Sequence, residues 1–321
     1  MGRVLVSVSH FDTLCKDAWK MLEDAGHEVV YEERPFPAYS YEELQKLLPE
    51  IDAAIVGLDT YTEDVWKISD RLKGASKFGV GVDNFDLDAA TKYGKIVTNC
   101  PGQNSNAVAE LTVCYMLSVL RFVAPLDAAM KRNEWPRYVG EEMEGRTIGL
   151  YGFGAIARMV AKKLMNFDVK VIAYDLYPNE AAAKELNVEM VTAEEVIEKS
   201  DIVSLHAPAT SENHHLFCRE TFGRMKDGAY LINAARGGLV DLEALAEALK
   251  SGKLKGAALD AFEVEGAGSL ASSAIMECEN VILTPHTGAE TYDAYRKVGI
   301  VAAQNVIDIM DGKKPKYQVN K

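Results

Sequence analysis

The sequence predicts an α/β protein composed of two doubly wound parallel sheets. Short apolar stretches typical of buried strands alternate with helical stretches along the whole chain, and this rhythm favours parallel strands covered by helices on both faces. A glycine-rich turn also joins one apolar stretch directly to a helical stretch near residue 150. The length of 321 residues is enough for about two domains.

The first series of elements occupies roughly the first hundred residues. Its helices are expected at residues 14–25, where Gly26 is the stop signal, and at 41–48. Its strands are expected at residues 3–8, 27–31, 51–56, 77–82 and 96–99.

A second series follows a long helix expected at residues 106–123. That helix is apolar nearly all round, which indicates burial in a core or between subunits. A helix at 156–165 and a final helix at 290–310 are expected, together with strands at 147–151, 169–174, 202–205, 230–233, 257–259 and 281–284. We place the boundary near Pro101 and expect the last helix to return to the first unit. The predicted domains are 1–100 plus 289–321, and 101–288.

Composition excludes several classes of partner. Asp and Glu number 48 against 35 Lys and Arg, giving a formal charge of −13 that repels nucleic acid and anionic membrane surfaces. The first ten residues do not resemble a signal peptide, and the longest apolar stretch, residues 111–120, is too short to span a membrane. Five cysteines without C-x-x-C spacing favour reduced thiols in a cytoplasmic protein, with neither a disulfide framework nor a metal site.

Residues 147–157, TIGLYGFGAIA, carry the pattern G-x-G-x-x-A between a strand and a helix. Gly152 permits the tight turn, Gly154 lets the backbone approach a pyrophosphate, and Ala157 allows close helix packing. Asp175 ends the next strand, 23 residues after Gly152, where a carboxylate accepts hydrogen bonds from ribose hydroxyls and repels a 2′-phosphate. The pattern therefore predicts NAD as cofactor, in preference to NADP.

Three later strand ends carry polar residues that a plain core does not need. Arg236 follows one strand, Asp260 ends another with Glu263 and Glu265 beyond it, and His286 follows a third. Arginine binds a carboxylate through two hydrogen bonds, and histidine exchanges a proton with a carbonyl oxygen. A carboxylate beside the histidine would favour the imidazolium and orient the ring, and from the residues alone either glutamate suits this role.

Seven motifs together resemble the NAD-dependent D-isomer-specific 2-hydroxyacid dehydrogenases over nearly the full length of the chain. They are GVGVDNFD, NCPGQNSNAVAE, GLYGFGAIA, SLHAP, NAARGGLVD, ALDAFEVE and LTPHTG. The resemblance implies a Rossmann NAD-binding domain, a flavodoxin-like substrate domain, and a homodimer formed through the region after Pro101.

The resemblance also implies roles for individual residues. Arg236 would bind the substrate, His286 would be the acid/base, and Glu265, five residues after Asp260, would be the carboxylate partner in place of Glu263. The substrate would contact Arg236, His286 and the backbone N–H groups of Val80 and Gly81. The residues implied to contact the cofactor are Gly152, Gly154, Ala155, Ile156, Asp175, Ala207, Pro208, Asn213, Ala234 and, at the nicotinamide end, Asp260.

The family includes enzymes for several substrates, and we favour a small unphosphorylated 2-oxoacid such as glyoxylate, hydroxypyruvate or pyruvate. The loop at residues 57–64 is acidic, and Asp59 there would repel a phosphate. Leu58 would then form the floor of the pocket and Trp135 a wall from the other subunit. A 3-phosphoglycerate dehydrogenase remains open, because Arg137 could supply an offsetting charge. An NAD-sensing corepressor-like protein is the alternative of another class.

Overall fold

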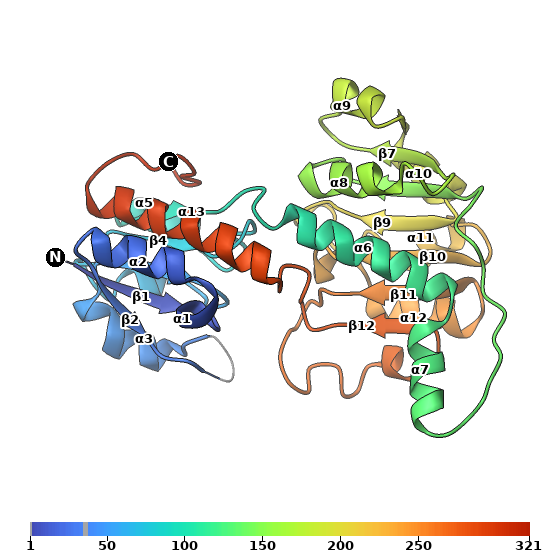
Figure 1. Cartoon of the computed structure of the whole chain (residues 1–321), viewed down its shortest axis with the longest axis horizontal. Helices are drawn as coiled ribbons and strands as arrows, with labels where there is room; N and C mark the ends of the chain where they lie inside the picture. The colour runs from blue at the N-terminus through green and yellow to red at the C-terminus, as the bar shows by residue number, and fades with distance from the viewer. Residues whose placement is uncertain (1, 35–37) are drawn as a thin grey trace. The chain divides into compact units, whose positions relative to one another are not determined.

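The computed structural model describes residues 2–34 and 38–321. The chain divides into two compact units, which Figure 1 colours from blue to red along the sequence. Unit 1 comprises Met1–Asn104 and Glu290–Lys321, and unit 2 comprises Ser105–Ala289. Each unit contains its own parallel sheet, so the α/β class with two sheets, predicted from the sequence, is confirmed.

Unit 1 contains five parallel strands in the order β2-β1-β3-β4-β5, which is the flavodoxin-like order. The strands are β1 (Arg3–Ser7), β2 (Glu28–Tyr31), β3 (Ala53–Val56), β4 (Gly74–Lys77) and β5 (Ile96–Thr98). Alternate residues of β1 face opposite cores: Val4 and Val6 pack on one side, and Leu5 packs on the other. The helices α2 (Lys16–Asp24) and α13 (Tyr292–Met310) pack together over the first face. Residues of α3 (Tyr41–Leu47) and α5 (Leu87–Lys92) contribute to the second.

Unit 2 contains seven parallel strands in the order β12-β11-β10-β9-β6-β7-β8. This is the Rossmann order with one strand added beyond the sixth. The strands are β6 (Thr147–Tyr151), β7 (Lys170–Tyr174), β8 (Val188–Met190), β9 (Ile202–Leu205), β10 (Ala229–Asn233), β11 (Leu254–Leu259) and β12 (Val281–Leu283). Helix α6 (Ser105–Leu120) lies along α8 (Ala155–Leu164) (Figure 1), and their residues share one core. Residues of α10 (Ala193–Lys199), α11 (Arg219–Arg224) and α12 (Leu242–Lys250) pack in the other core.

Two predicted elements were wrong in extent. The apolar helix ends at Leu120, because Phe122 adopts a left-handed φ of 55°, and α7 (Val123–Lys131) continues at a bend of 68°. The strand expected at 77–82 is β4, which ends at Lys77 because the chain turns at Gly79, where φ is +151°. The short strand β8 was not expected. Among the described residues no single helix is long and apolar enough to cross a membrane, and only the bent pair α6–α7 has the necessary length and composition together.

The strand order of unit 2 determines where a ligand can bind. The chain proceeds outward from β6 in one direction through β7 and β8, and in the other through β9 to β12. Helices following β6 and β9 therefore lie on opposite faces, which opens a crevice at the carboxyl ends of these two strands. The glycine loop follows β6, so the fold brings it to this point.

Gly74 provides a test of the packing in unit 1. A Cβ at this position of β4 would overlap the Ile96 backbone carbonyl on the neighbouring strand. Because backbone atoms cannot rotate away, we expect Gly74→Ala to reduce the free energy of unfolding by roughly 1–3 kcal/mol. The matched control is Gly223→Ala, at an exposed helical position where a Cβ would meet nothing within 4 Å. Urea unfolding followed by circular dichroism measures both, and an unchanged midpoint for Gly74→Ala would contradict this packing argument.

Candidate active site

The two glycines of the loop after β6 differ in what the fold requires of them. Gly152 has a φ of +97°, and a Cβ there would lie 2.8 Å from the His206 backbone at the end of β9. Gly154 is the N-cap of α8 in an extended conformation, and a Cβ there would meet nothing within 4 Å. The protein's own packing thus explains glycine at 152 and leaves open space at 154, where the N–H groups of Ala155 and Ile156 begin the helix.

Asp175 follows β7 and contacts the same loop. Its Oδ2 accepts a 2.6 Å hydrogen bond from the Phe153 N–H, and its Oδ1 accepts one of 2.8 Å from the Tyr177 N–H. The Asp175 carboxylate therefore braces the loop, a role that sequence reasoning missed. A hollow adjoins it, lined by residues that include Tyr174, Pro178 and Met190.

The chain segments after β9 and β10 lie at the same carboxyl edge of the sheet as the glycine loop. Ala207 is half-buried and Pro208 is exposed directly beyond β9, and Ala234 is half-buried directly beyond β10. The Asn213 side chain closes its own loop: Nδ2 donates to the Pro208 carbonyl at 2.8 Å, and Oδ1 accepts from the Thr210 N–H at 2.7 Å. These predicted cofactor residues thus follow the carboxyl ends of adjacent strands.

His286 and Glu265 form a close pair. Nδ1 of His286 lies 2.9 and 3.1 Å from the two carboxylate oxygens of Glu265. Burial alone would raise the pKa of Glu265, but the hydrogen bond and charge of His286, the Phe262 N–H and the charge of Arg236 together lower it. The carboxylate therefore accepts from Nδ1–H, and the tautomer so fixed leaves Nε2 for proton exchange. Both side chains remain partly open to solvent.

The two candidate glutamates have separate partners. Glu265 faces His286, whereas Glu263 contacts His214 and His215. The geometry thus distinguishes two residues that the pattern of the sequence alone leaves equivalent.

Arg236 lies at the N-cap of a short 3-10 helix, Gly237–Leu239, immediately after β10. Its backbone carbonyl accepts a 2.9 Å hydrogen bond from the Asn233 side chain, and its Nη1 donates to the Ala235 carbonyl at 2.8 Å. Its charge contributes to the lowered pKa of Glu265. Arg236, Glu265 and His286 therefore belong to one neighbourhood of unit 2.

Asp260 is a buried residue that fixes the position of the loop carrying His286. It is 2% exposed, and its Oδ2 accepts from the Gly288 N–H at 2.7 Å. Its Oδ1 accepts from the Thr287 N–H at 2.8 Å and from the Thr284 hydroxyl at 2.5 Å. These bonds hold the loop in which His286 adopts a φ of 55°. The sequence indicated a ligand contact for Asp260 but gave no signal of this bracing.

Four further residues that were predicted to contact the substrate or line its pocket lie outside the strands of unit 2. They are Val80, Gly81, Trp135 and Arg137. Within the part of the chain that the structure describes, the Val80 and Gly81 N–H groups, which follow β4, have no hydrogen-bond acceptor. Trp135 is 80% exposed, and Arg137 is exposed as well.

Asp59 does not face a bound phosphate as the sequence suggested, because its side chain points into unit 1. Asp59 is 1% exposed, and its carboxylate accepts hydrogen bonds from the Ser7 hydroxyl and from the Tyr39 N–H. Burial raises its pKa, with those two hydrogen bonds and the charge of Lys77 opposing the rise. Its neighbour Leu58 is 44% exposed, so the apolar side chain faces out at the end of β3 and the acidic one does not.

Comparison with known proteins relates the chain to one family. Residues 113–288 match the family model described as "D-isomer specific 2-hydroxyacid dehydrogenase, NAD binding domain". The chain is 37% identical to a hydroxypyruvate reductase of Thermotoga maritima, over 95% of this chain and 98% of the relative. It is 38% identical to a glyoxylate reductase of Thermofilum pendens, over 94% and 90% respectively. It is also 37% identical to a D-3-phosphoglycerate dehydrogenase of Methanocaldococcus jannaschii, over its full length but only 60% of that relative.

Solved structures resemble the whole chain. The TT0316 protein of Thermus thermophilus superimposes with a TM-score of 0.89 at 33% identity, covering 99% of both chains. The apo structure of D-lactate dehydrogenase from Escherichia coli gives 0.86 at 28% identity, covering 99% of this chain and 100% of that one.

The two glycines provide a test of the cofactor site. We expect Gly154→Ala to leave the urea midpoint unchanged, because its Cβ meets no protein atom, yet to raise the Kd for NADH at least ~10-fold by intruding on the pyrophosphate. Gly152→Ala should instead cost roughly 1–3 kcal/mol of folding stability, since its φ is left-handed and its Cβ meets backbone. Fluorescence titration with NADH measures the affinity. Wild-type affinity in Gly154→Ala would remove this turn from the cofactor site.

Proposed function

This chain belongs to the D-isomer-specific 2-hydroxyacid dehydrogenases, which are NAD-dependent oxidoreductases, and on that premise we propose that it interconverts a small unphosphorylated 2-oxoacid and the corresponding D-2-hydroxyacid. Glyoxylate, hydroxypyruvate and pyruvate are the candidates. The observation that carries the proposal is the His286–Glu265 pair beside Arg236. These are a proton donor, the carboxylate that orients it, and a cation able to bind a carboxylate.

Each of these residues has a distinct role in the proposal. In the reduction, His286 donates the proton on Nε2 to the carbonyl oxygen of the substrate as that oxygen gains charge. Glu265 stabilises the imidazolium form of His286 and prevents rotation of the ring. Arg236 binds the substrate carboxylate through two hydrogen bonds and polarises the carbonyl. The N–H groups of Val80 and Gly81 provide further donors for the substrate carboxylate.

The residues around the glycine loop suit a dinucleotide. The open space at Gly154 would accommodate a pyrophosphate, the first N–H groups of α8 would donate hydrogen bonds to it, and Asp175 would accept from the ribose hydroxyls. NADH supplies the hydride when it is bound. We assign the remaining contacts to Gly152, Ala155, Ile156, Ala207, Pro208, Asn213 and Ala234, with Asp260 at the nicotinamide end.

Preference for an unphosphorylated substrate is supported by the segment after β3. Leu58 is exposed there, and residues 57–64 include no basic side chain that could hold a phosphate. The alternative, 3-phosphoglycerate, is favoured by the relative of that name, and exposed Arg137 is then the residue to test. Turnover of any 2-oxoacid excludes a protein that only senses NAD.

Unit 2 is the proposed NAD-binding domain, and unit 1 the proposed substrate domain. Apolar side chains on and after α6 and α7 are exposed, and they suit the interface of a homodimer. They are Leu117, Val123, Met130 and Val139. A solution mass equal to a single chain would contradict this assembly.

Cofactor choice tests the role of Asp175. We expect NADH to exceed NADPH in kcat/KM by at least ~10-fold, because the carboxylate repels a 2′-phosphate. Asp175→Asn removes the charge while keeping an acceptor for the Phe153 N–H. It should therefore reduce the ratio of kcat/KM with NADH to kcat/KM with NADPH. The control is Asp227→Asn, an exposed carboxylate paired with Lys253, which should keep the preference. Equal use of the two cofactors by the natural chain would contradict the assignment.

The pH dependence of turnover tests the role of Glu265. An ionised carboxylate at His286 favours the imidazolium, so Glu265→Gln makes the proton easier to lose. Reduction needs the protonated ring, and its alkaline limb should move to lower pH. Oxidation needs the neutral ring, and its acid limb should move in the same direction.

Glu263→Gln is the matched control for this experiment, since its carboxylate faces His214 and His215 and both limbs should stay in place. Profiles of kcat/KM against pH in the two directions measure the limbs. Unshifted limbs in Glu265→Gln, or a shift to higher pH, would remove Glu265 from the pair.

A panel of 2-oxoacids tests the substrate class directly. With NADH oxidation followed at saturating cofactor, glyoxylate, hydroxypyruvate or pyruvate should exceed 3-phosphohydroxypyruvate in kcat/KM by at least ~10-fold. The reverse order would establish the phosphorylated substrate, and Arg137→Ala would then be expected to lower its kcat/KM.

A further inference from the structure

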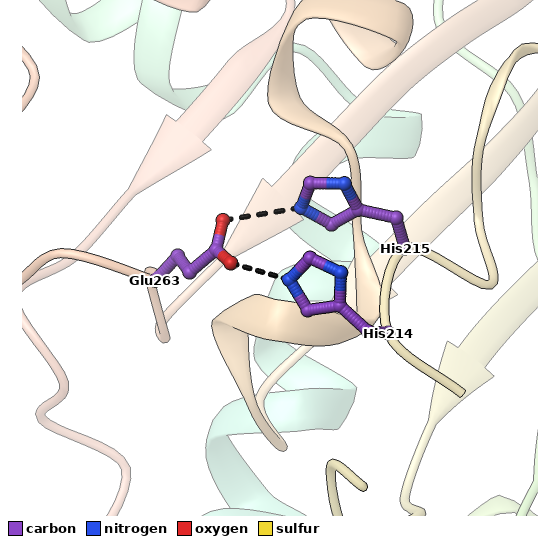
Figure 2. Close-up of side chains that lie close together, drawn as sticks. All are labelled: His214, His215 and Glu263. Atoms are coloured by element: carbon purple, nitrogen blue, oxygen red, sulfur yellow. Dashed lines mark hydrogen bonds and ion pairs between the residues drawn. The ribbon is translucent and has the colours of Figure 1, made fainter. Parts of the chain in front are cut away.

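Three side chains of unit 2 that the proposed reaction does not use converge at one point (Figure 2). His214 and His215 lie in the loop between β9 and α11, and Glu263 lies beyond β11. Nε2 of His214 is 2.5 Å from one carboxylate oxygen of Glu263, and Nε2 of His215 is 3.1 Å from the other. The two imidazole rings are stacked, with their centroids 3.9 Å apart.

The backbone around this cluster is held in place by the fold. The His215 N–H donates to the Gly238 carbonyl at 2.8 Å, and the Phe217 N–H donates to the Leu239 carbonyl at 2.9 Å. The Glu263 segment packs so closely on Gly237 that a Cβ there would overlap its backbone. Both loops are therefore anchored on residues 237–239, and the three side chains meet because of that anchoring.

The donor set has the chemistry of a metal site. One ligand atom from each residue lies within 4.8 Å of the other two, and hydrogen bonds from the two histidines lower the pKa of Glu263, which keeps it in the ligating carboxylate form. Two imidazole nitrogens and one carboxylate oxygen form a set typical of Zn²⁺. Tetrahedral ligand atoms at about 2.1 Å from an ion lie about 3.4 Å apart, so the contact of 2.5 Å must lengthen and the contact of 3.1 Å is already close to that separation. All three side chains are partly exposed, so an ion can enter and water can fill the remaining positions.

We propose that His214, His215 and Glu263 bind one divalent transition cation of the Zn²⁺ class. The ion would link the loop after β9 to the segment that carries Glu265, because Glu265 follows Glu263 by two residues and accepts a 3.3 Å hydrogen bond from the Phe262 N–H. The site is a clamp between two loops. It depends on no part of the proposed reaction. Cysteine spacing, the only metal-site signal weighed in the sequence, predicted no such site.

Isothermal titration of the full chain with Zn²⁺ tests the site. We expect one binding event that weakens at least ~10-fold in the double variant His214→Gln/His215→Asn. Asparagine suits position 215 because φ there is 51°, a conformation that asparagine tolerates. The matched control is His10→Asn, which removes an exposed histidine that pairs with the single carboxylate of Glu33, and it should keep the binding event. Circular dichroism and urea midpoints verify that each variant folds.

A second measurement distinguishes this site from a thiol site. Cys218, three residues after His215, is partly exposed, and Cys218→Ser should retain the Zn²⁺ event. Amide exchange of residues 206–217 and 260–266 should slow when Zn²⁺ is added to the wild type and stay unchanged in the double variant. No binding by the wild type, equal binding by the double variant, or loss of binding in Cys218→Ser would each overturn the proposal.

Discussion

The buried carboxylate of Asp260 is the group on which the arrangement of the candidate active site depends. A polar side chain at 2% exposure is costly to bury unless hydrogen bonds replace its water. Three of the replacements, the N–H groups of Thr287 and Gly288 and the Thr284 hydroxyl, come from the segment after β12. The Tyr115 hydroxyl on α6 donates a longer hydrogen bond of 3.3 Å. The carboxylate thereby fixes the loop that carries His286.

Hydrogen bonds of Asp260 and Asn233 also connect the ends of neighbouring strands. The Asp260 N–H donates to the Asn233 carbonyl at 2.9 Å, and the Asn233 side chain donates to the Arg236 carbonyl at 2.9 Å. Asn233 is itself buried. One chain of hydrogen bonds thus runs from β10 to the segment after β12 and sets the backbone of both Arg236 and His286. Residues that bear the chemistry remain partly exposed, and their supports are buried, which suits groups that must meet a ligand without moving.

Local patterns of the sequence were enough to predict the α/β class, the glycine loop and the cofactor, because strand periodicity and turn chemistry act over short distances. The break at Phe122 was placed three residues too late, because Phe122 is neither glycine nor proline and Pro125, the residue that marks the break, lies inside α7. The direction of Asp59 was mistaken because it lies beyond the end of β3, where alternation no longer assigns a side chain to a face. The pairing of Glu263 with His215 spans 48 residues, and only the packing of three loops on each other brings them together.

A double-mutant cycle on His286 and Glu265 tests the central claim, that these residues act as one unit held in place by the fold. The values of kcat/KM for reduction are compared for the wild type, His286→Gln, Glu265→Gln and the variant that combines both. If Glu265 acts only through His286, the combined variant should fall within ~3-fold of His286→Gln alone. Losses that multiply would show that the two residues act independently and would contradict the account.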